Sequence, residues 1–379
     1  MSTKLSIYIA ACCCAIFASC KDYADKAHGE IKDLKVTTVK IPETDVLNLP
    51  SYNLSAYYRD TTEWLYAYNY KTHALDCYDL RNRTVSQLPF KKDGPSAVTY
   101  IHSLQVCSPD SIWVFDESQR ALLVDRTGNV RRSVVLTDGL SEGQLIVAGH
   151  NYAMSTTDIY YDGARHSILC CVRDQSVSPA SFFIREVFLD DAPAMSYPLS
   201  LPEDIPNVGE REYPYMGQPN VTYLPNKILY NYPVDSHVYV MDRTSGKTQT
   251  FAANSNFTQN QVAPCHWNNY ADCERHRVEN PHFYELRYLP GRDMYLRLHV
   301  DGQEFDTTKD LGEMLASKHL YLTVFDNRLS VVGESELTPK RYCLFTGWCT
   351  TSDDLLIFAD NPLSEEEKGE YLEYDRLAW

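Results

Sequence analysis

The stretch that indicates the fold is residues 111–136, SIWVFDESQRALLVDRTGNVRRSVVL. It contains three short runs rich in aromatic and branched residues, at 111–115, 121–124 and 130–136, and polar turns separate them. This composition favours β-strands. The second run ends at Asp125, whose short carboxylate can accept backbone N–H bonds from the turn that follows. The stretch therefore predicts three consecutive strands with an aspartate at the last turn.

The same phrase, an apolar run followed by an aspartate and a turn, recurs along the chain. The aspartates are Asp79, Asp125, Asp174, Asp242, Asp326 and Asp375. Their base period is about 45 to 50 residues, with larger insertions between some copies, which indicates radially repeated four-stranded sheets. We therefore expect an all-β fold, a six-bladed β-propeller, with seven blades as the alternative.

Further strands and the closure of the ring follow from the same reasoning. The fourth unit has strand-like runs at 227–234, 237–241 and 248–252, and the fifth has them at 294–300, 320–325 and 329–337. A short helix is expected at 308–317. The last unit has its third strand at 371–374 and then an Asp turn, so residues 34–41 are expected to supply the missing outer strand and close the ring without an open edge.

The N-terminal residues indicate export. An apolar stretch at 5–18 ends in Phe17-Ala18-Ser19-Cys20, which resembles the lipobox of bacterial lipoproteins. We expect residues 1–19 to be a signal peptide, Cys20 to carry lipid such as palmitate, residues 20–31 to be a tether, and residues 32–379 to form the propeller. The alternatives are a signal peptide cut elsewhere or a buried N-terminal helix.

The net charge limits the kinds of partner that the protein can have, and the expected lipid anchor indicates its location. A formal net charge of -16 argues against nucleic acid as a partner, since an acidic surface would not neutralise phosphates. Cys20-Lys21-Asp22 resembles a surface-export signal of Bacteroidota lipoproteins. We therefore expect an outer-membrane lipoprotein, displayed on the cell surface rather than on the periplasmic face, whose lipid on Cys20 joins it to the membrane.

Four long loops are predicted on one face of the ring, at 192–217, 254–282, 302–319 and 361–369. Long loops on a rigid scaffold often bind ligands. Their aromatic and polar side chains suit a glycan or a peptide, although these side chains could instead pack the loops themselves. The candidate ligand-binding residues are Tyr213, Tyr215, His266, Trp267, Asn269, Tyr270 and His282.

The cysteines and a search for catalytic motifs do not identify an active site. Cys265 and Cys273 lie in one polar loop and are the disulfide pair we consider, because export permits disulfides. Cys265, His266, Cys273 and His276 do not match zinc-finger spacing, so neither a metal nor another cofactor is expected. The sequence contains no G-x-S-x-G, H-E-x-x-H or P-loop motif, and catalytic residues stay unknown.

Three functions remain open. A binding module for glycan or peptide is favoured, so the protein is expected not to be an enzyme. The first alternative is an envelope scaffold or sensor that docks another protein. The second is a hydrolase or lyase with acids at the propeller axis.

The lipobox, the aromatic-Asp-Arg turns and the tyrosine-rich strands together resemble an uncharacterised family of Bacteroidales lipoproteins, a domain of unknown function. The resemblance implies a propeller-like body and a Bacteroidota source. It implies no activity and no catalytic residues.

Overall fold

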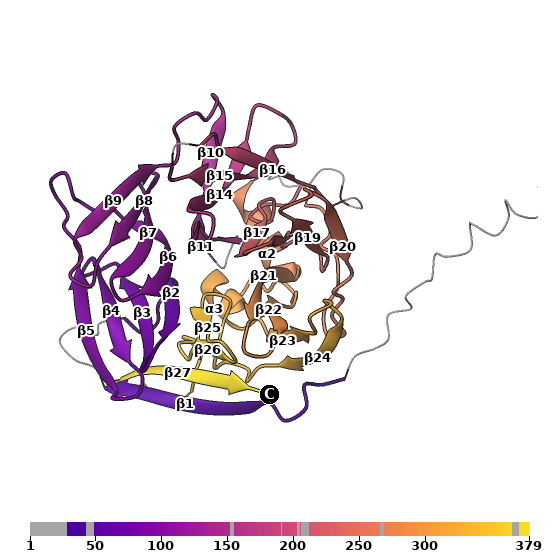
Figure 1. Cartoon of the computed structure of the whole chain (residues 1–379). Coiled ribbons are helices and arrows are strands. Elements are labelled where there is room, and N and C mark those ends of the chain that lie inside the picture. The colour runs from indigo at the N-terminus through magenta and orange to yellow at the C-terminus, as the bar shows by residue number, and fades with distance from the viewer. Residues whose placement is uncertain are drawn as a thin grey trace, which may run out of the picture.

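The computed structural model describes residues 29–42, 49–151, 155–190, 192–202, 205, 212–265, 269–365 and 371–379. These residues form six sheets around a central axis, so the six-bladed propeller is confirmed (Figure 1). Cys20, the expected signal peptide at 1–19 and most of the expected tether at 20–31 lie outside the described residues.

The first three blades follow the chain outward from the axis. Blade one is β2 (Ser55–Arg59), β3 (Glu63–Asn69), β4 (Ala74–Asp79) and β5 (Thr84–Pro89). Blade two is β6 (Ile101–Ser108), β7 (Ser111–Asp116), β8 (Arg120–Val124) and β9 (Val130–Val135). Blade three is β10 (Gln144–Val147), β13 (Tyr160–Asp162), β14 (Ser167–Asp174), β15 (Ser181–Phe188) and β16 (Met195–Leu199).

The remaining blades complete the ring. Blade four is β17 (Asn220–Leu224), β18 (Lys227–Asn231), β19 (Val238–Asp242) and β20 (Thr248–Phe251). Blade five is β21 (His282–Leu289), β22 (Met294–Val300), β23 (Leu320–Phe325) and β24 (Val331–Glu336). Blade six is β25 (Trp348–Thr350), β26 (Leu355–Phe358), β27 (Tyr371–Ala378) and β1 (Lys35–Pro42).

The N-terminal strand closes the ring, as the sequence predicts. β1 pairs antiparallel with β27 from Lys35 opposite Ala378 to Pro42 opposite Tyr371. Figure 1 shows the two strands side by side along one edge of the ring, indigo against yellow. The outer edge of the last blade is therefore covered by the first strand of the chain.

Four of the six repeated aspartates form the predicted turns between third and fourth strands. Asp79 accepts the backbone N–H groups of Arg81 at 3.0 Å and Asn82 at 2.9 Å. Asp242 accepts those of Thr244 and Ser245 at 3.0 and 2.7 Å. Asp125 and Asp326 make equivalent bonds.

The prediction is wrong for the other two aspartates. β10 and β13 both pair with the inner edge of β14, so β14 is the second strand outward from the axis. Asp174 ends β14 and therefore lies on the opposite face of the ring. Asp375 lies inside β27 and is fully buried, because β27 continues to Ala378 rather than ending at Tyr374. Asp375 accepts hydrogen bonds from Thr38 at 2.7 Å and Tyr342 at 2.5 Å, so it joins β1 to the body of the ring.

Blade three contains an insertion that the sequence did not reveal. Between β10 and β13 the chain leaves the blade and forms β11 (Gly149–Asn151) and β12 (Ser155–Thr157). β12 pairs in parallel with β17, through Thr157 opposite Val221. The insertion therefore adds two strands to the axial edge of blade four.

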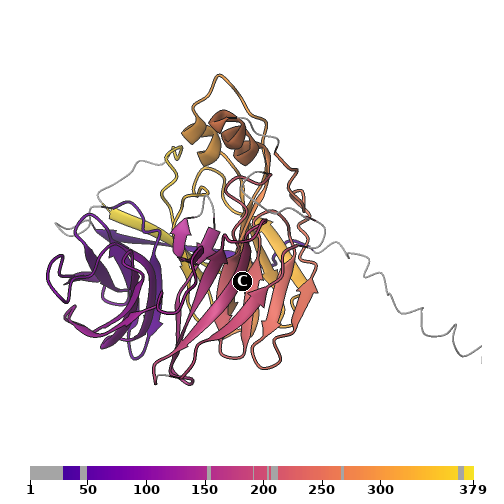
Figure 2. The same ribbon diagram turned by 90° about the horizontal axis from the view of Figure 1, so that it is seen from above.

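Links between blades, and connections between second and third strands, share one face of the ring, which we call the upper face. Two helices stand above this face, α2 (Tyr270–Glu279) and α3 (Leu311–Ala316) (Figure 2). The α3 helix lies where the sequence predicts a helix, whereas α2 was not predicted. The expected loop at 192–217 contains β16, so the link to blade four begins only at residue 200.

The long loops pack against one another to form a cap. The ammonium of Lys318 donates to the carbonyl oxygens of Arg277 at 2.8 Å and Asn280 at 2.7 Å, at the end of α2. Asn361 donates to the carbonyl oxygen of Ala316 at 2.9 Å. Among the residues that the structure describes, no helix is long and apolar enough to cross a membrane.

Buried arginines hold neighbouring blades together. Arg297 in blade five donates to two carbonyl oxygens of blade four, each at 2.7 Å, and its guanidinium lies over the rings of Phe283 and Phe325. Arg243 in blade four donates to Glu186 in blade three at 2.9 Å. Arg243 also pairs with Asp162 at 2.7 Å, so the buried charges of blades three and four form one network.

Candidate functional site

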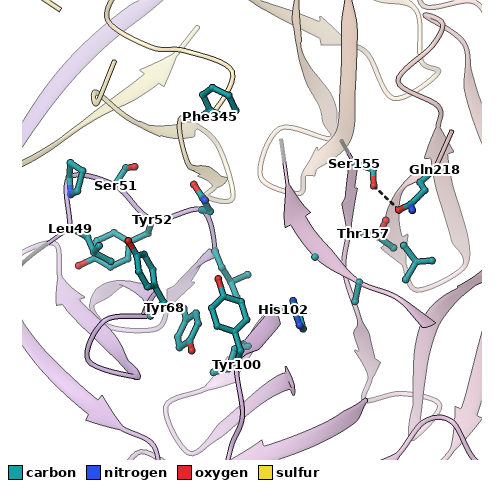
Figure 3. Close-up of a pocket in the computed structure, with 18 residues that line it drawn as sticks. Leu49, Ser51, Tyr52, Tyr68, Tyr100, His102, Ser155, Thr157, Gln218 and Phe345 are labelled. Atoms are coloured by element: carbon teal, nitrogen blue, oxygen red, sulfur yellow. Dashed lines mark hydrogen bonds between the residues drawn. The ribbon is translucent and has the colours of Figure 1, made fainter. Parts of the chain in front are cut away.

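A cavity of about 680 Å³ lies where the inner strands converge. Its walls come from blades one, two, three, four and six, and Figure 3 shows ten of its residues labelled. Most of the lining lies before or at the start of inner strands, at residues 49–54, 100–102, 218 and 345. Two further lining residues, Tyr68 and Tyr70, lie where β3 leads into β4. These are upper-face positions, so the cavity opens on the face that carries the long loops.

One wall is aromatic. The rings of Tyr68 and Tyr100 meet edge to face, 5.4 Å apart and at 81°, and Tyr100 lies 5.2 Å from the ring of His102. Nε2 of His73 contacts the carbonyl oxygen of Val98 at 2.7 Å, so this nitrogen is the donor. Nδ1 of His73 is then the acceptor for the Tyr68 hydroxyl at 3.1 Å, which fixes the ring that supports Tyr100.

The mouth of the cavity exposes aromatic surface. Tyr70 is 56% exposed, Tyr100 is 48% exposed and Phe345 is 40% exposed. Large apolar side chains gathered at a cavity mouth are unusual on a folded domain and mark binding surfaces. The three rings come from blades one, two and six, so the ring fold brings them together.

A buried carboxylate supports this wall from below. The Tyr52 hydroxyl donates to Asp76 at 2.5 Å, and Asp76 also accepts from Asn69 at 2.9 Å and Gln87 at 2.8 Å. Burial is the main cause that raises the pKa of Tyr52 far above its ordinary value, so the phenol keeps its proton. Asp76 is fully buried, and its bonds fix the Tyr52 ring against the cavity.

The opposite wall is polar. Ser155 and Thr157 come from β12, and Gln218 precedes β17; Figure 3 shows them facing Tyr52, Tyr68, Tyr100 and His102 across the cavity. The Ser155 hydroxyl donates to the Gln218 amide oxygen at 3.4 Å. Asn220 accepts the N–H of Thr156 at 2.6 Å and so holds β12 in place. The insertion in blade three and the link that precedes β17 therefore supply the polar wall together.

No ionised side chain lines the cavity among the described residues. None of its 18 lining residues is Asp, Glu, Lys or Arg. Burial lowers the pKa of His102 and raises that of Tyr68 to about 12, so the imidazole and the phenol are uncharged at neutral pH. The cavity therefore offers aromatic faces and neutral hydrogen-bonding groups.

A close backbone contact between Gly347 and Tyr52 fixes the third side of the cavity. A Cβ atom at Gly347 would lie 1.9 Å from the carbonyl oxygen of Tyr52, so only glycine allows this approach. The Ser51 and Thr346 hydroxyls both donate to the carboxylate of Asp360. The link before β2 and the loop that carries Phe345 are thus joined into one edge of the cavity.

The residues predicted from the long loops do not line this cavity. Tyr213 and His282 are buried, and Asn269 caps α2 by accepting the N–H of Asp272 at 3.1 Å. Tyr215 lies under the guanidinium of Arg277, and Tyr270, which is 67% exposed, shares a side-chain hydrogen bond with Tyr215. His266 and Trp267 lie outside the described residues. Tyr213 therefore packs against blades three and four, whereas Tyr215 and Asn269 contact α2.

The cysteine pair is not bonded in the structure. Cys265 and Cys273 are separate buried thiols, and their sulfurs contact the carbonyl oxygens of Asp272 and Asn269 at 3.8 and 3.7 Å. His276 places Nε2 2.7 Å from the carbonyl oxygen of Ala263. Within the described part of the chain, no three His, Cys, Asp or Glu side chains form a group that could hold a metal ion.

Two carboxylates lie close to the axis, where the hydrolase hypothesis would place its acids. Arg287 donates to Asp158 at 2.8 Å and to Glu285 at 3.0 Å, and neither acid lines the cavity.

Comparison with known proteins agrees with the fold. The sequence matches the DUF4221 family, a domain of unknown function, over residues 35–336, and it matches no curated protein. A DUF4221 protein from Bacteroides vulgatus shares the fold with a TM-score of 0.71 and 14% identity, covering 91% of this chain and 98% of that chain. A candidate exported protein from Bacteroides fragilis has a TM-score of 0.54 and 12% identity, covering 92% and 98%. The resemblance inferred from the sequence is confirmed: this chain is a propeller of the DUF4221 family.

Proposed function

We propose that the protein is a binding module and that its ligand is an uncharged carbohydrate held in the central cavity. The observation that carries the proposal is the pairing of an exposed aromatic wall with a neutral polar wall. The C–H faces of a sugar ring stack on aromatic rings, while its hydroxyl groups need donors and acceptors nearby. Tyr100 and Gln218 offer these two kinds of contact on opposite sides.

A peptide fits this cavity less well. A peptide brings charged termini or side chains, and the described lining offers no ionised group to pair with them. Leaving a charge in such a site without a partner is costly. The same absence of charge suits the hydroxyl groups of a neutral glycan.

Residues that lie before the described ring suggest where the module works. We infer from the lipobox-like sequence at 17–20 that Cys20 carries lipid and holds the propeller to the outer membrane, facing the outside. Replacing Cys20 with Ala should abolish incorporation of labelled palmitate and release the protein from the membrane fraction. Unchanged labelling in Cys20→Ala would contradict this anchor.

Binding is tested on an array of neutral and charged glycans, with matched variants. Tyr100→Ala removes the exposed ring of the aromatic wall, and Tyr270→Ala removes an exposed ring of α2 that does not line the cavity. We expect the protein and Tyr270→Ala to bind the same neutral glycans and Tyr100→Ala to lose them. Loss in Tyr270→Ala alone would place the site on the cap, and binding to no glycan would overturn the proposal.

A further inference from the structure

We infer that the cavity is closed below, so that it receives the end of a carbohydrate chain rather than a segment from its middle. This inference rests on the proposed function, and its argument concerns what lies beneath the cavity floor.

The inner strands continue directly from the cavity into a layer of polar contacts. His102 lines the cavity, and the next residue, Ser103, lies one step deeper along β6. Thr157 also lines it, and the next residue is Asp158. The Ser103 hydroxyl donates to Asp158 at 3.3 Å and accepts the N–H of Ile159 at 2.9 Å. Blade two and the insertion of blade three are therefore joined just below the floor.

This layer extends to the far side of the ring. Arg287 of β21 donates to Asp158 at 2.8 Å and to Glu285 at 3.0 Å, and its guanidinium lies 5.7 Å from the centre of the Trp348 ring. Trp348 begins β25 of blade six. A single arginine thus connects blade five to blade six and to the insertion.

Blade four is tied into the same level. The Thr222 hydroxyl of β17 donates to the carbonyl oxygen of Leu286 at 2.5 Å, between Glu285 and Arg287 on β21. Ser103, Thr222 and Glu285 are each almost wholly buried, and the side chains of Arg287 and Asp158 are 22% and 18% exposed. Charged and hydrogen-bonded groups of this kind are costly to separate. A ligand that enters the cavity is therefore not expected to displace this layer.

A closed floor limits how a polymer can bind. A chain that enters from the upper face meets the layer of Ser103, Asp158 and Arg287 and cannot leave through the lower face. A cavity of about 680 Å³ has the size of pockets that enclose small ligands, so it can hold a short terminal portion of a chain. Binding should therefore scale with the number of chain ends and not with polymer mass.

The test compares intact and shortened polymers. The purified protein is titrated by calorimetry with neutral α-glucan, β-glucan, mannan and galactan, each intact and after partial cleavage by an endo-acting enzyme, at equal mass. Tyr100→Ala and Tyr270→Ala are titrated in parallel. We expect at least one polymer to gain binding sites per gram in proportion to its new ends, in the protein and in Tyr270→Ala but not in Tyr100→Ala.

The two proposals fail in different ways. Equal binding per gram before and after cleavage, still abolished by Tyr100→Ala, would overturn chain-end recognition and leave carbohydrate binding in place. Weaker binding after cleavage would overturn it too, because a longer internal segment would then be the ligand. Binding to none of the polymers in either form would count against the proposed function itself.

Discussion

Tyr100 stands edge-on to Tyr68 across the join of blades one and two, and only Tyr100 has half of its surface exposed. Tyr68 is held by His73, so the inner ring is fixed and the outer ring is presented to the cavity. The pair therefore combines a structural tyrosine with a contact tyrosine, although the two have the same side chain.

Substitutions at Tyr100 should separate the ring from its hydroxyl. Tyr100→Phe keeps the stacking face, so we expect the dissociation constant for a bound glycan to change less than about threefold. Tyr100→Ala should weaken binding about tenfold or more, since aromatic side chains at binding centres contribute about 1.4 kcal/mol or more. Calorimetric titration measures both. Equal losses in the two variants would show that the hydroxyl, not the ring face, makes the contact.

The pairing of β1 with β27, which closes the ring and which we call the seam, gives a stability prediction. Asp375→Ala should lower the free energy of unfolding by about 3 kcal/mol, because it removes the buried acceptor of Tyr342 and leaves Arg341 with Glu373 alone of its two carboxylates. The matched control is Asp326→Ala, which removes turn bonds near the surface and should cost about 1 kcal/mol. Urea unfolding of both variants checks the difference. Similar costs would mean that Asp375 is another turn residue and does not hold the seam.

The backbone contact at Gly347 should matter for both stability and binding. Gly347→Ala places a methyl group against the carbonyl of Tyr52, and we expect a loss of about 3 kcal/mol with displacement of residues 49–54. Gly163→Ala is the control, since its Cβ would make an ordinary contact at 3.4 Å with the Tyr161 ring. Thermal unfolding and glycan titration of both variants test this. A stable Gly347→Ala with unchanged binding would rule out a close approach there.

Acid should destabilise the protein through His282. Burial lowers the pKa of His282 from 6.5 to about 3, so the unfolded chain binds a proton in this window and the folded chain does not. The free energy of unfolding therefore falls as the pH is lowered below 6.5, by about 1.4 kcal/mol per pH unit from this group. His282→Leu should lose about 2 kcal/mol less than the parent protein between pH 7 and pH 5. Identical losses by urea unfolding would show that His282 is protonated in the fold.

The sequence revealed the ring because the ring depends on local patterns. Runs such as 111–116 have the composition of strands, and an aspartate after the third strand satisfies turn N–H groups, as at Asp79 and Asp242. The same local pattern failed at Asp375, because a short apolar phrase does not distinguish a strand end from a strand interior that pairs with a distant segment. The insertion at 148–159 was missed because its one pairing with β17 joins residues far apart in the chain.

The central cavity could not be predicted from the positions of the long loops. Its lining comes from short segments such as 100–102 and 155–157, and only the closure of the ring brings them together. Tyr68, Tyr70, Tyr100 and His102 lie at or beside the upper-face ends of β3 and β6, two strands whose bounds were not predicted from the sequence. The long loops drew attention because of their aromatic residues, but Tyr213 packs against blades three and four and Tyr215 contacts α2.

The central claim is that the cavity between Tyr100 and Gln218 holds a carbohydrate. A crystal structure of the protein with a bound oligosaccharide, chosen from the array, tests it most directly. The account predicts a terminal sugar ring lying against Tyr100, with its hydroxyl groups on Gln218 and Ser155 and no chain continuing below Ser103. A sugar bound on the cap near Tyr270, or a chain passing through the ring, would contradict it.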